Sequence, residues 1–142
     1  MTEKMYLLDT CIWRDFYEDR FSKIGRPLGK YATDLFMKIL KNKDKILFSE
    51  ALIWELKKDY EEKDINDMLN LLFLNKTLIR IEINKEEYLE AKKLSQQRNI
   101  PFIDCLNVIH ARNYKSIMVS QDFHYLKDLS DIIESVKPEQ IS

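Results

Sequence analysis

The stretch Met5-Tyr6-Leu7-Leu8-Asp9-Thr10-Cys11-Ile12 decides the fold of this chain. Its apolar run is short and is followed at once by Asp9 and Thr10, two residue types that commonly precede the first turn of a helix. A short apolar run bounded in this way is typical of a buried strand that leads directly into a helix. Residues Lys45–Phe48 and Ile117–Val119 have the same character and predict two further buried strands.

Segments with helical character separate these strands. They cover residues 27–42, 49–60, 65–74, 84–98 and 101–114. Residues 78–83 place Leu78, Arg80 and Glu82 on one side and three isoleucines on the other, which predicts an edge strand with one wet face. Residues 122–129 are expected to be helical or irregular, and residues 132–136 to form a last short strand.

Strands that alternate with helices favour right-handed crossovers and parallel pairing. A length of 142 residues agrees with one domain. We therefore expect a single α/β domain over residues 1–142, with a mostly parallel central sheet of about four or five strands and helices on both faces.

Composition excludes several classes of function. The chain has 23 Lys and Arg against 24 Asp and Glu, so its net charge of -1 gives polyanions no general attraction. Only two glycines occur, Gly25 and Gly29, which excludes nucleotide sites built on a Gly-rich phosphate loop. No apolar run approaches the roughly 18 residues of a membrane span. Two cysteines without an export signal indicate free thiols and a cytoplasmic location.

Charge is nevertheless sorted along the chain. Residues 20–45 hold eight basic and two acidic side chains, a local balance of +6. Such asymmetry is the usual mark of a chain that meets charged partners. Basic residues on the solvated face of a helix give the same pattern, so both interpretations stay open.

Four acidic residues stand where an open parallel sheet binds its ligands, beyond the carboxyl ends of the strands. Asp9 and Asp122 follow two of the buried strands. Asp104 and Glu55 lie in the early turns of two helices. Carboxylates within about 5 Å of one another repel by roughly 3 kcal/mol per pair at an effective dielectric near 20. A convergent set therefore needs a cation, although Asp104 taken alone is also explained as a group that stabilises its helix dipole.

The types of ligand indicate which cation to expect. His110 and His124 are the only histidines, and no Cys or His pair has the spacing of a zinc site. Carboxylates suit Mg²⁺ or Mn²⁺, which keep several waters and are completed by phosphate oxygens. Such a centre is typical of phosphodiester hydrolysis, in which the metal lowers the pKa of a bound water. Glu50 competes with Glu55 for the second acidic role, but Glu50 directly follows Ser49 and is better explained by the helix dipole.

Four motifs occur in an order that is known from one family. They are Leu7-Leu8-Asp9-Thr10, Ser49 with Glu55-Leu56 six positions later, Ile103-Asp104, and Val119-Ser120-Gln121-Asp122, with Pro138-Glu139 further on. In this order and spacing they resemble PIN-domain ribonucleases, and the size is similar to that of the VapC-like toxin branch. Cys11 departs from the usual Asn, and Ser120-Gln121 departs from the commoner Thr-Arg or Thr-Asn. Neither change removes a carboxylate.

The resemblance implies a metal-dependent endoribonuclease that cuts RNA with a water nucleophile and leaves a 5′-phosphate. It implies Asp9 and Asp104 as the principal ligands of Mg²⁺ (or Mn²⁺). Glu55 would complete the site or orient water, and Asp122 would bind a second metal or hold the first ligands through water.

The same resemblance implies hydroxyl groups and partners around the metal. Thr10 and Ser120 would hydrogen-bond the carboxylates and keep them aimed. Toxins of this branch form homodimers and are held inactive by a small antitoxin that inserts a segment into the acidic groove. We therefore expect an antitoxin and a second copy of the chain as partners, beside the RNA substrate.

Several assignments keep an alternative. Arg14, Arg112 and His124 are candidates for contacts with the substrate, and each is also explained as an ordinary surface residue. The whole chain is also compatible with a non-catalytic RNA- or protein-binding module that uses residues 20–45, or with an RNA-processing PIN nuclease that has no antitoxin. A phosphatase with Asp9 as nucleophile is disfavoured, because Cys11 stands where such enzymes place a second Asp.

Overall fold

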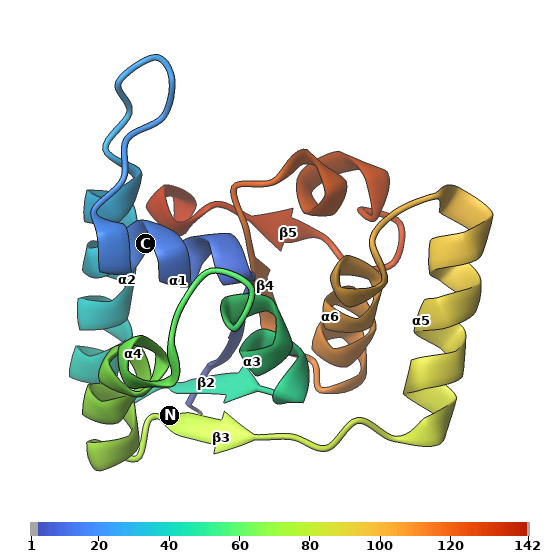
Figure 1. The fold of residues 1–142 in the computed structure, drawn as a ribbon, viewed down its shortest axis with the longest axis horizontal. Coiled ribbons are helices and arrows are strands. Elements are labelled where there is room, and N and C mark those ends of the chain that lie inside the picture. Colours follow the sequence, from blue (N-terminus) through green and yellow to red (C-terminus); the bar gives the residue numbers. More distant parts are fainter. Residues whose placement is uncertain (1–2, 142) are drawn as a thin grey trace.

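The computed structural model describes residues 3–141 and is built on a five-stranded parallel sheet (Figure 1). The strands are β1 (Met5–Leu8), β2 (Lys45–Phe48), β3 (Leu78–Arg80), β4 (Ile117–Val119) and β5 (Ser135–Val136). Their order across the sheet is β3-β2-β1-β4-β5, and every neighbouring pair is parallel. The predicted α/β fold with a parallel central sheet is therefore confirmed.

The first strand occupies the centre of this sheet. Leu7 of β1 is in register with Leu47 of β2 on one side and with Met118 of β4 on the other. The chain moves outward from β1 through β2 to β3, and then returns to β4 and β5 on the opposite side. The strand order therefore switches between β1 and β4, and Asp9 and Ser120 directly follow these two strands. An open parallel sheet binds its ligands beyond the strand ends at such a switch.

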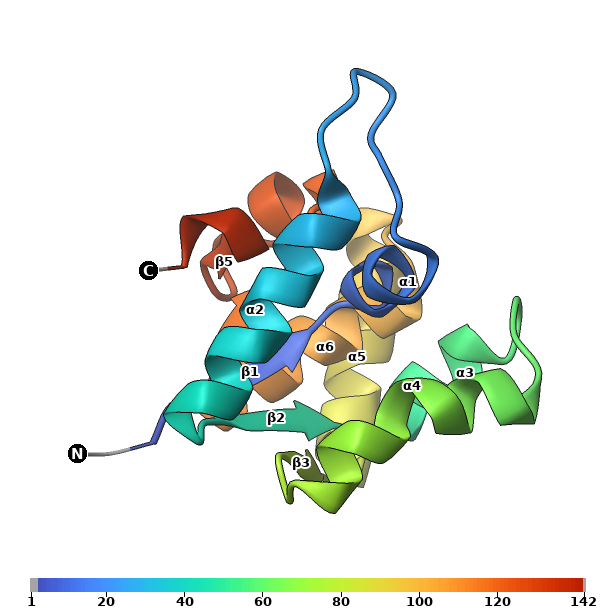
Figure 2. The same cartoon turned by 90° about the vertical axis from the view of Figure 1, so that its left-hand side faces the viewer.

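Helices cover both faces of the sheet (Figures 1 and 2). They are α1 (Thr10–Glu18), α2 (Leu28–Asn42), α3 (Glu50–Leu56), α4 (Glu62–Leu74), α5 (Lys85–Arg98) and α6 (Phe102–Asn113), followed by a π-helical turn η1 (His124–Asp128) and a 3₁₀ turn η2 (Pro138–Gln140). Tyr6 and Leu8 pack into one hydrophobic cluster with α1, α2 and α4, whereas Leu7 packs into a second cluster with α5 and α6. This alternation places the two clusters on opposite faces of β1.

Polar residues explain where several helices begin. The Ser49 hydroxyl accepts the backbone N–H of Ala51 at 3.2 Å and caps α3. Asn84 caps α5 through a reciprocal pair in which the Glu87 N–H donates to Asn84 Oδ1 at 2.8 Å. Asp9 occupies the equivalent position before α1, but its side chain makes no capping bond. Its carboxylate is therefore free for other contacts.

Some element boundaries differ from the expected ones. Helix α3 ends at Leu56 and not near residue 60, because residues 57–59 form a turn, and α4 begins at Glu62, three positions earlier than expected. Strands β3 and β5 are shorter than predicted. The edge position of β3 is confirmed, but its predicted faces are wrong at Ile79. Ile79 is 37% exposed while Leu78 packs against the first cluster, because a short edge strand leaves one side open to solvent.

Residues 19–27, between α1 and α2, form a loop that projects from the body of the molecule (Figure 2). At its base the Gly29 N–H donates to the Arg20 carbonyl at 2.8 Å. A Cβ on Gly29 would overlap the backbone of Asp19, so glycine is needed for the two ends of the loop to meet. Among the helices of residues 3–141, none has the length and apolar character that crossing a membrane requires.

Candidate metal centre

Asp9 lies buried at the carboxyl end of β1, with 6% of its surface exposed. One oxygen, Oδ2, accepts hydrogen bonds from the Ser120 hydroxyl at 2.9 Å and from the Cys11 thiol at 3.0 Å. Both donors use the same oxygen, and within residues 3–141 Oδ1 accepts no hydrogen bond. The second oxygen of Asp9 is therefore available to a ligand.

Ser120 joins the two central strands at the switch. Its hydroxyl donates to Asp9 and accepts the backbone N–H of Asp122 at 2.9 Å. The backbone N–H of Asp9 in turn donates to the carbonyl of Val119 at 2.9 Å. These bonds fix the positions of Asp9 and Asp122 relative to each other.

Asp104 approaches the same place from the first turn of α6, and the place beyond β1 and β4 that Asp9, Asp104, Asp122 and His124 share is called the crevice below. Oδ1 of Asp104 accepts the Tyr125 hydroxyl at 3.2 Å, and its Oδ2 lies 2.9 Å from Nδ1 of His124. The Tyr125 oxygen also accepts a hydrogen bond from the Asn107 side chain at 3.0 Å. A buried chain of polar groups therefore orients this carboxylate.

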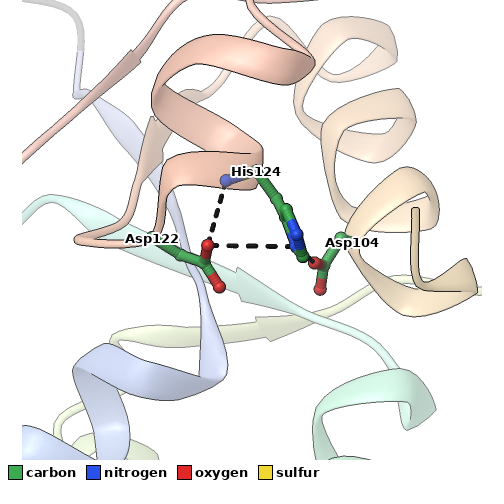
Figure 3. A group of neighbouring side chains, drawn as sticks. All are labelled: Asp104, Asp122 and His124. Atoms are coloured by element: carbon green, nitrogen blue, oxygen red, sulfur yellow. Dashed lines mark hydrogen bonds and ion pairs between the residues drawn. The ribbon is translucent and has the colours of Figure 1, made fainter. Parts of the chain in front are cut away.

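Asp122 and His124 complete the cluster from the turn that leads into η1 (Figure 3). The His124 backbone N–H donates to Asp122 Oδ1 at 2.9 Å, and its ring Nδ1 lies 3.9 Å from the same oxygen. Asp104, Asp122 and His124 each offer one potential ligand atom, and these three atoms lie within 4.8 Å of one another.

The surroundings of Asp9 and Asp104 disfavour the ionised form of their carboxylates. Burial raises the pKa of Asp9 from 3.8 to about 6, and the negative charges of Asp104 and Asp122 add to this effect. Burial also raises the pKa of Asp104, with a further contribution from Asp122. The hydrogen bond to Asp104 raises the pKa of His124. The buried acids Asp9 and Asp104, the more exposed Asp122 and a neighbouring imidazole are a donor set that fits a divalent cation.

Glu55, the fourth predicted acid, is not among the residues brought together. Its carboxylate pairs with Lys58 at 2.9 Å, and its backbone carbonyl accepts the Arg14 guanidinium at 3.2 Å. Glu50 points toward the edge of the sheet, where it pairs with Arg80. Glu50 also lies in the first turn of α3, the position on which its expected interaction with the helix dipole depends.

The remaining predicted residues occupy varied positions. Thr10 is buried at the start of α1 and lines a small pocket with Asn107. Arg14 lies on α1 and also pairs with Asp59 at 2.8 Å. Arg112 lies eight residues after Asp104 on α6, roughly 12 Å along the helix, and its guanidinium binds Glu90 through two hydrogen bonds. Arg112 is therefore not part of the crevice.

Residues 20–45 present less free positive charge than the sequence suggests. Arg20 pairs with the buried Asp15 at 3.0 Å, and Lys30 pairs with Asp34 at 2.9 Å. Arg26 contacts Glu139 of η2. Several of these basic side chains are thus neutralised locally by acids from α1, α2 and η2.

The other histidine and Cys105 lie apart from the acids, whereas the Cys11 thiol contacts Asp9. His110 is fully buried between α5 and α6, with Nε2 3.4 Å from Glu87 Oε1, and burial lowers its pKa. Cys105 belongs to the second hydrophobic cluster, and both it and Cys11 are free thiols. Burial and the charge of Asp9 hold the pKa of the Cys11 thiol well above its ordinary value, so it stays a protonated donor.

Two residues of the crevice were missed at the level of sequence. Asn107 follows Asp104 by three positions, a spacing that places both on one side of a helix, and this signal was available. Tyr125 follows His124 directly, and nothing in its sequence context distinguishes it from a core tyrosine. Its contact with Asp104 depends on how η1 packs against α6.

Comparisons with known proteins agree with this architecture. A family model described as PIN domain matches residues 6–131. A toxin-antitoxin complex from Klebsiella pneumoniae is similar in structure, with a TM-score of 0.60, 18% identity, and 94% of this chain and 97% of that chain covered. VapBC2 from Rickettsia felis, bound to a DNA fragment from their promoter, gives a TM-score of 0.59 at 19% identity over 94% and 97% of the chains.

PAE2754 from Pyrobaculum aerophilum gives a TM-score of 0.58 at 14% identity, covering 96% of this chain and 85% of that one. At these identities the solved structures agree in fold. No curated protein sequence matches the chain significantly.

Proposed function

Because the chain belongs to the PIN domain family, whose members are nucleases, we propose that it is a metal-dependent endoribonuclease that hydrolyses RNA and leaves a 5′-phosphate. We propose further that it is the toxin of a type II toxin-antitoxin pair. The observation that carries the proposal lies at the switch between β1 and β4, where Asp104, Asp122 and His124 offer ligand atoms within 4.8 Å of one another and Ser120 links Asp9 to Asp122. A cation offsets the repulsion between such carboxylates, and a phosphodiester is the substrate that such a cation serves.

In this proposal Asp9, Asp104 and Asp122 would hold Mg²⁺ or Mn²⁺. Asp9 would offer Oδ1, because its Oδ2 already accepts two hydrogen bonds. Asp122 would offer Oδ2, because its Oδ1 accepts the His124 N–H. When bound, the ion would supply a Lewis acid that lowers the pKa of a water and offsets negative charge on the phosphate.

The protein's own contribution is to keep the carboxylates aimed. Ser120 holds Oδ2 of Asp9, and Tyr125 holds Oδ1 of Asp104. Loss of hydrogen bonds that orient metal ligands typically weakens metal binding about 10- to 100-fold. The two hydroxyls therefore count among the residues that the reaction would need.

Glu55 would join the centre by turning away from Lys58. Lys58 is 65% exposed and Glu55 19% exposed, and ion pairs at a protein surface contribute only about 0 to 1 kcal/mol. Breaking this pair would thus cost little when RNA and cation bind. Glu55 would then orient water or complete the metal site.

The toxin assignment implies two protein partners, an antitoxin and a second copy of the chain. A small antitoxin would cover the acidic crevice, and two copies of the chain would form a homodimer. Toxin-antitoxin complexes of the same fold support this assignment. The two free thiols agree with work in the reducing cytoplasm.

Cleavage of single-stranded RNA in the presence of Mg²⁺ or Mn²⁺ tests the enzyme assignment. We expect Asp9→Asn and Asp104→Asn to abolish cleavage. Asp34→Asn is the matched control, since Asp34 is exposed on α2 and pairs with Lys30. Undiminished cleavage by both crevice variants would exclude these carboxylates as the catalytic acids.

Growth on induction of the gene tests the toxin assignment. We expect arrest with the wild type, no arrest with Asp9→Asn, and rescue by co-expression of the protein encoded in the neighbouring open reading frame. RNA cleavage without growth arrest would instead favour an RNA-processing nuclease on the same fold.

A further inference from the structure

The ring of His124 faces two carboxylates with the same nitrogen. Nδ1 lies 2.9 Å from Asp104 Oδ2 and 3.9 Å from Asp122 Oδ1. Both neighbours are acceptors when ionised, so Nδ1 must face them either with the ring N–H or with a bound cation, and not with a bare lone pair. A ring with its hydrogen on Nδ1 donates to Asp104, and a metal ion between the three side chains would take the place of that hydrogen.

The spacing of the three side chains suits shared coordination. Around an ion with bonds of about 2.1 Å in octahedral geometry, adjacent ligand atoms lie roughly 3 Å apart and opposite ones roughly 4 Å apart. The potential ligand atoms of Asp104, Asp122 and His124 all lie within 4.8 Å of one another. Small side-chain rotations would bring them onto one ion, and the His124 side chain, 40% exposed, has room to rotate.

The backbone fixes where this ring can reach. The His124 N–H is held by Asp122 Oδ1 at 2.9 Å, and its carbonyl accepts the N–H of Leu129 at 2.9 Å in η1. The ring therefore projects from a fixed backbone position and lies between Asp122 and Asp104 (Figure 3). Nδ1 of the ring is therefore directed toward the two acids.

We propose that His124 is a ligand of the cation through Nδ1, and that this makes the centre take Mn²⁺ in preference to Mg²⁺. The inference rests on the proposed function only in assuming that the acids bind a divalent ion. Mg²⁺ prefers oxygen ligands, whereas imidazole nitrogen suits transition metals. One nitrogen in place of an oxygen therefore shifts the selectivity of an otherwise carboxylate site toward Mn²⁺.

Pulsed electron paramagnetic resonance of bound Mn²⁺ tests this directly, because a coordinated imidazole gives a nitrogen coupling. The experiment uses untagged, metal-free protein to which Mn²⁺ is added. The chain has two histidines, and His110 is buried against Glu87 between α5 and α6, so a nitrogen signal has one source. We expect the coupling in the wild type and in Phe123→Ala, a control at an exposed neighbouring position.

The matched variant is His124→Asp, which keeps a ligand but replaces nitrogen by oxygen. We expect the nitrogen coupling to disappear and the ratio of Mn²⁺ to Mg²⁺ affinities, measured by competition, to fall about tenfold. Circular dichroism of each variant checks that the fold is retained.

Three results would overturn the inference: Mn²⁺ bound without a nitrogen coupling, an unchanged affinity ratio in His124→Asp, or no binding of Mn²⁺ at all. The proposed function fails separately. RNA cleavage without the nitrogen coupling would support the nuclease assignment and exclude His124 as a ligand. The coupling without RNA cleavage would support His124 as a ligand and contradict the nuclease assignment.

Discussion

Replacing Asp9 by Asn should stabilise the metal-free protein near neutral pH. Burial, with the charges of Asp104 and Asp122, raises the pKa of Asp9 from 3.8 to about 6. Folding is therefore penalised when this carboxylate is ionised, and a difference of about two pH units at about 1.4 kcal/mol each gives about 3 kcal/mol. Asn would keep the present hydrogen bonds, because Ser120 and Cys11 both donate to one oxygen.

The penalty has a defined dependence on pH. Because the folded pKa lies above the unfolded one, the contribution of Asp9 to stability is fully present below 3.8 and is lost as the pH rises through about 6. The unfolding free energy of Asp9→Asn minus that of the wild type should therefore increase between about pH 4 and pH 6 and stay constant above.

Urea unfolding in the presence of a chelator, followed by circular dichroism at a series of pH values, measures this difference. Asp34→Asn, at an exposed site, should show no such increase. A difference between Asp9→Asn and the wild type that is independent of pH would refute the reasoning. So would a variant that is less stable than the wild type at neutral pH.

Three further predictions concern single side chains. Ser120→Ala should weaken Mn²⁺ binding, measured by calorimetry, about 10- to 100-fold, because Asp9 loses a hydrogen bond that orients it. An unchanged affinity would mean that Ser120 does not orient Asp9 for metal binding. Gly29→Ala should destabilise the protein by about 1 to 3 kcal/mol in urea, because a Cβ there overlaps the backbone of Asp19. Leu106→Ala should cost about 2 to 5 kcal/mol, since this side chain is fully buried in the second cluster; a smaller loss in either variant would mean that the site relaxes.

The ends of the central strands were predictable because burial imposes a strong pattern on short strands. Leu7 and Leu8 must be apolar to pack on the two faces of β1, so Asp9 is recognisable as the first residue outside the sheet. The same argument placed Asp122 just beyond β4. Strand order then brings these acids together, and this follows from topology without knowledge of any side-chain contact.

Contacts between side chains of different elements were much harder to predict. Glu55 has the right spacing for the family motif, yet its carboxylate pairs with Lys58, in the turn that follows α3. The charge of residues 20–45 is similarly reduced by partners distant in sequence, such as Glu139 for Arg26. Sequence position alone does not say which rotamer a long charged side chain adopts, because several are close in energy.

The order of the strands also governs when the acid centre can form during synthesis. Strand β1 can pair with β2 once Phe48 has left the ribosome, but its other neighbour, β4, is made much later. The bond between Ser120 and Asp9 spans 111 positions of the sequence. A growing chain can therefore pair β1 with β2 and β2 with β3, but the acids are not assembled until β4 and Asp122 have been made. The acids can therefore share a cation only late in translation, after β4 has been added beside β1.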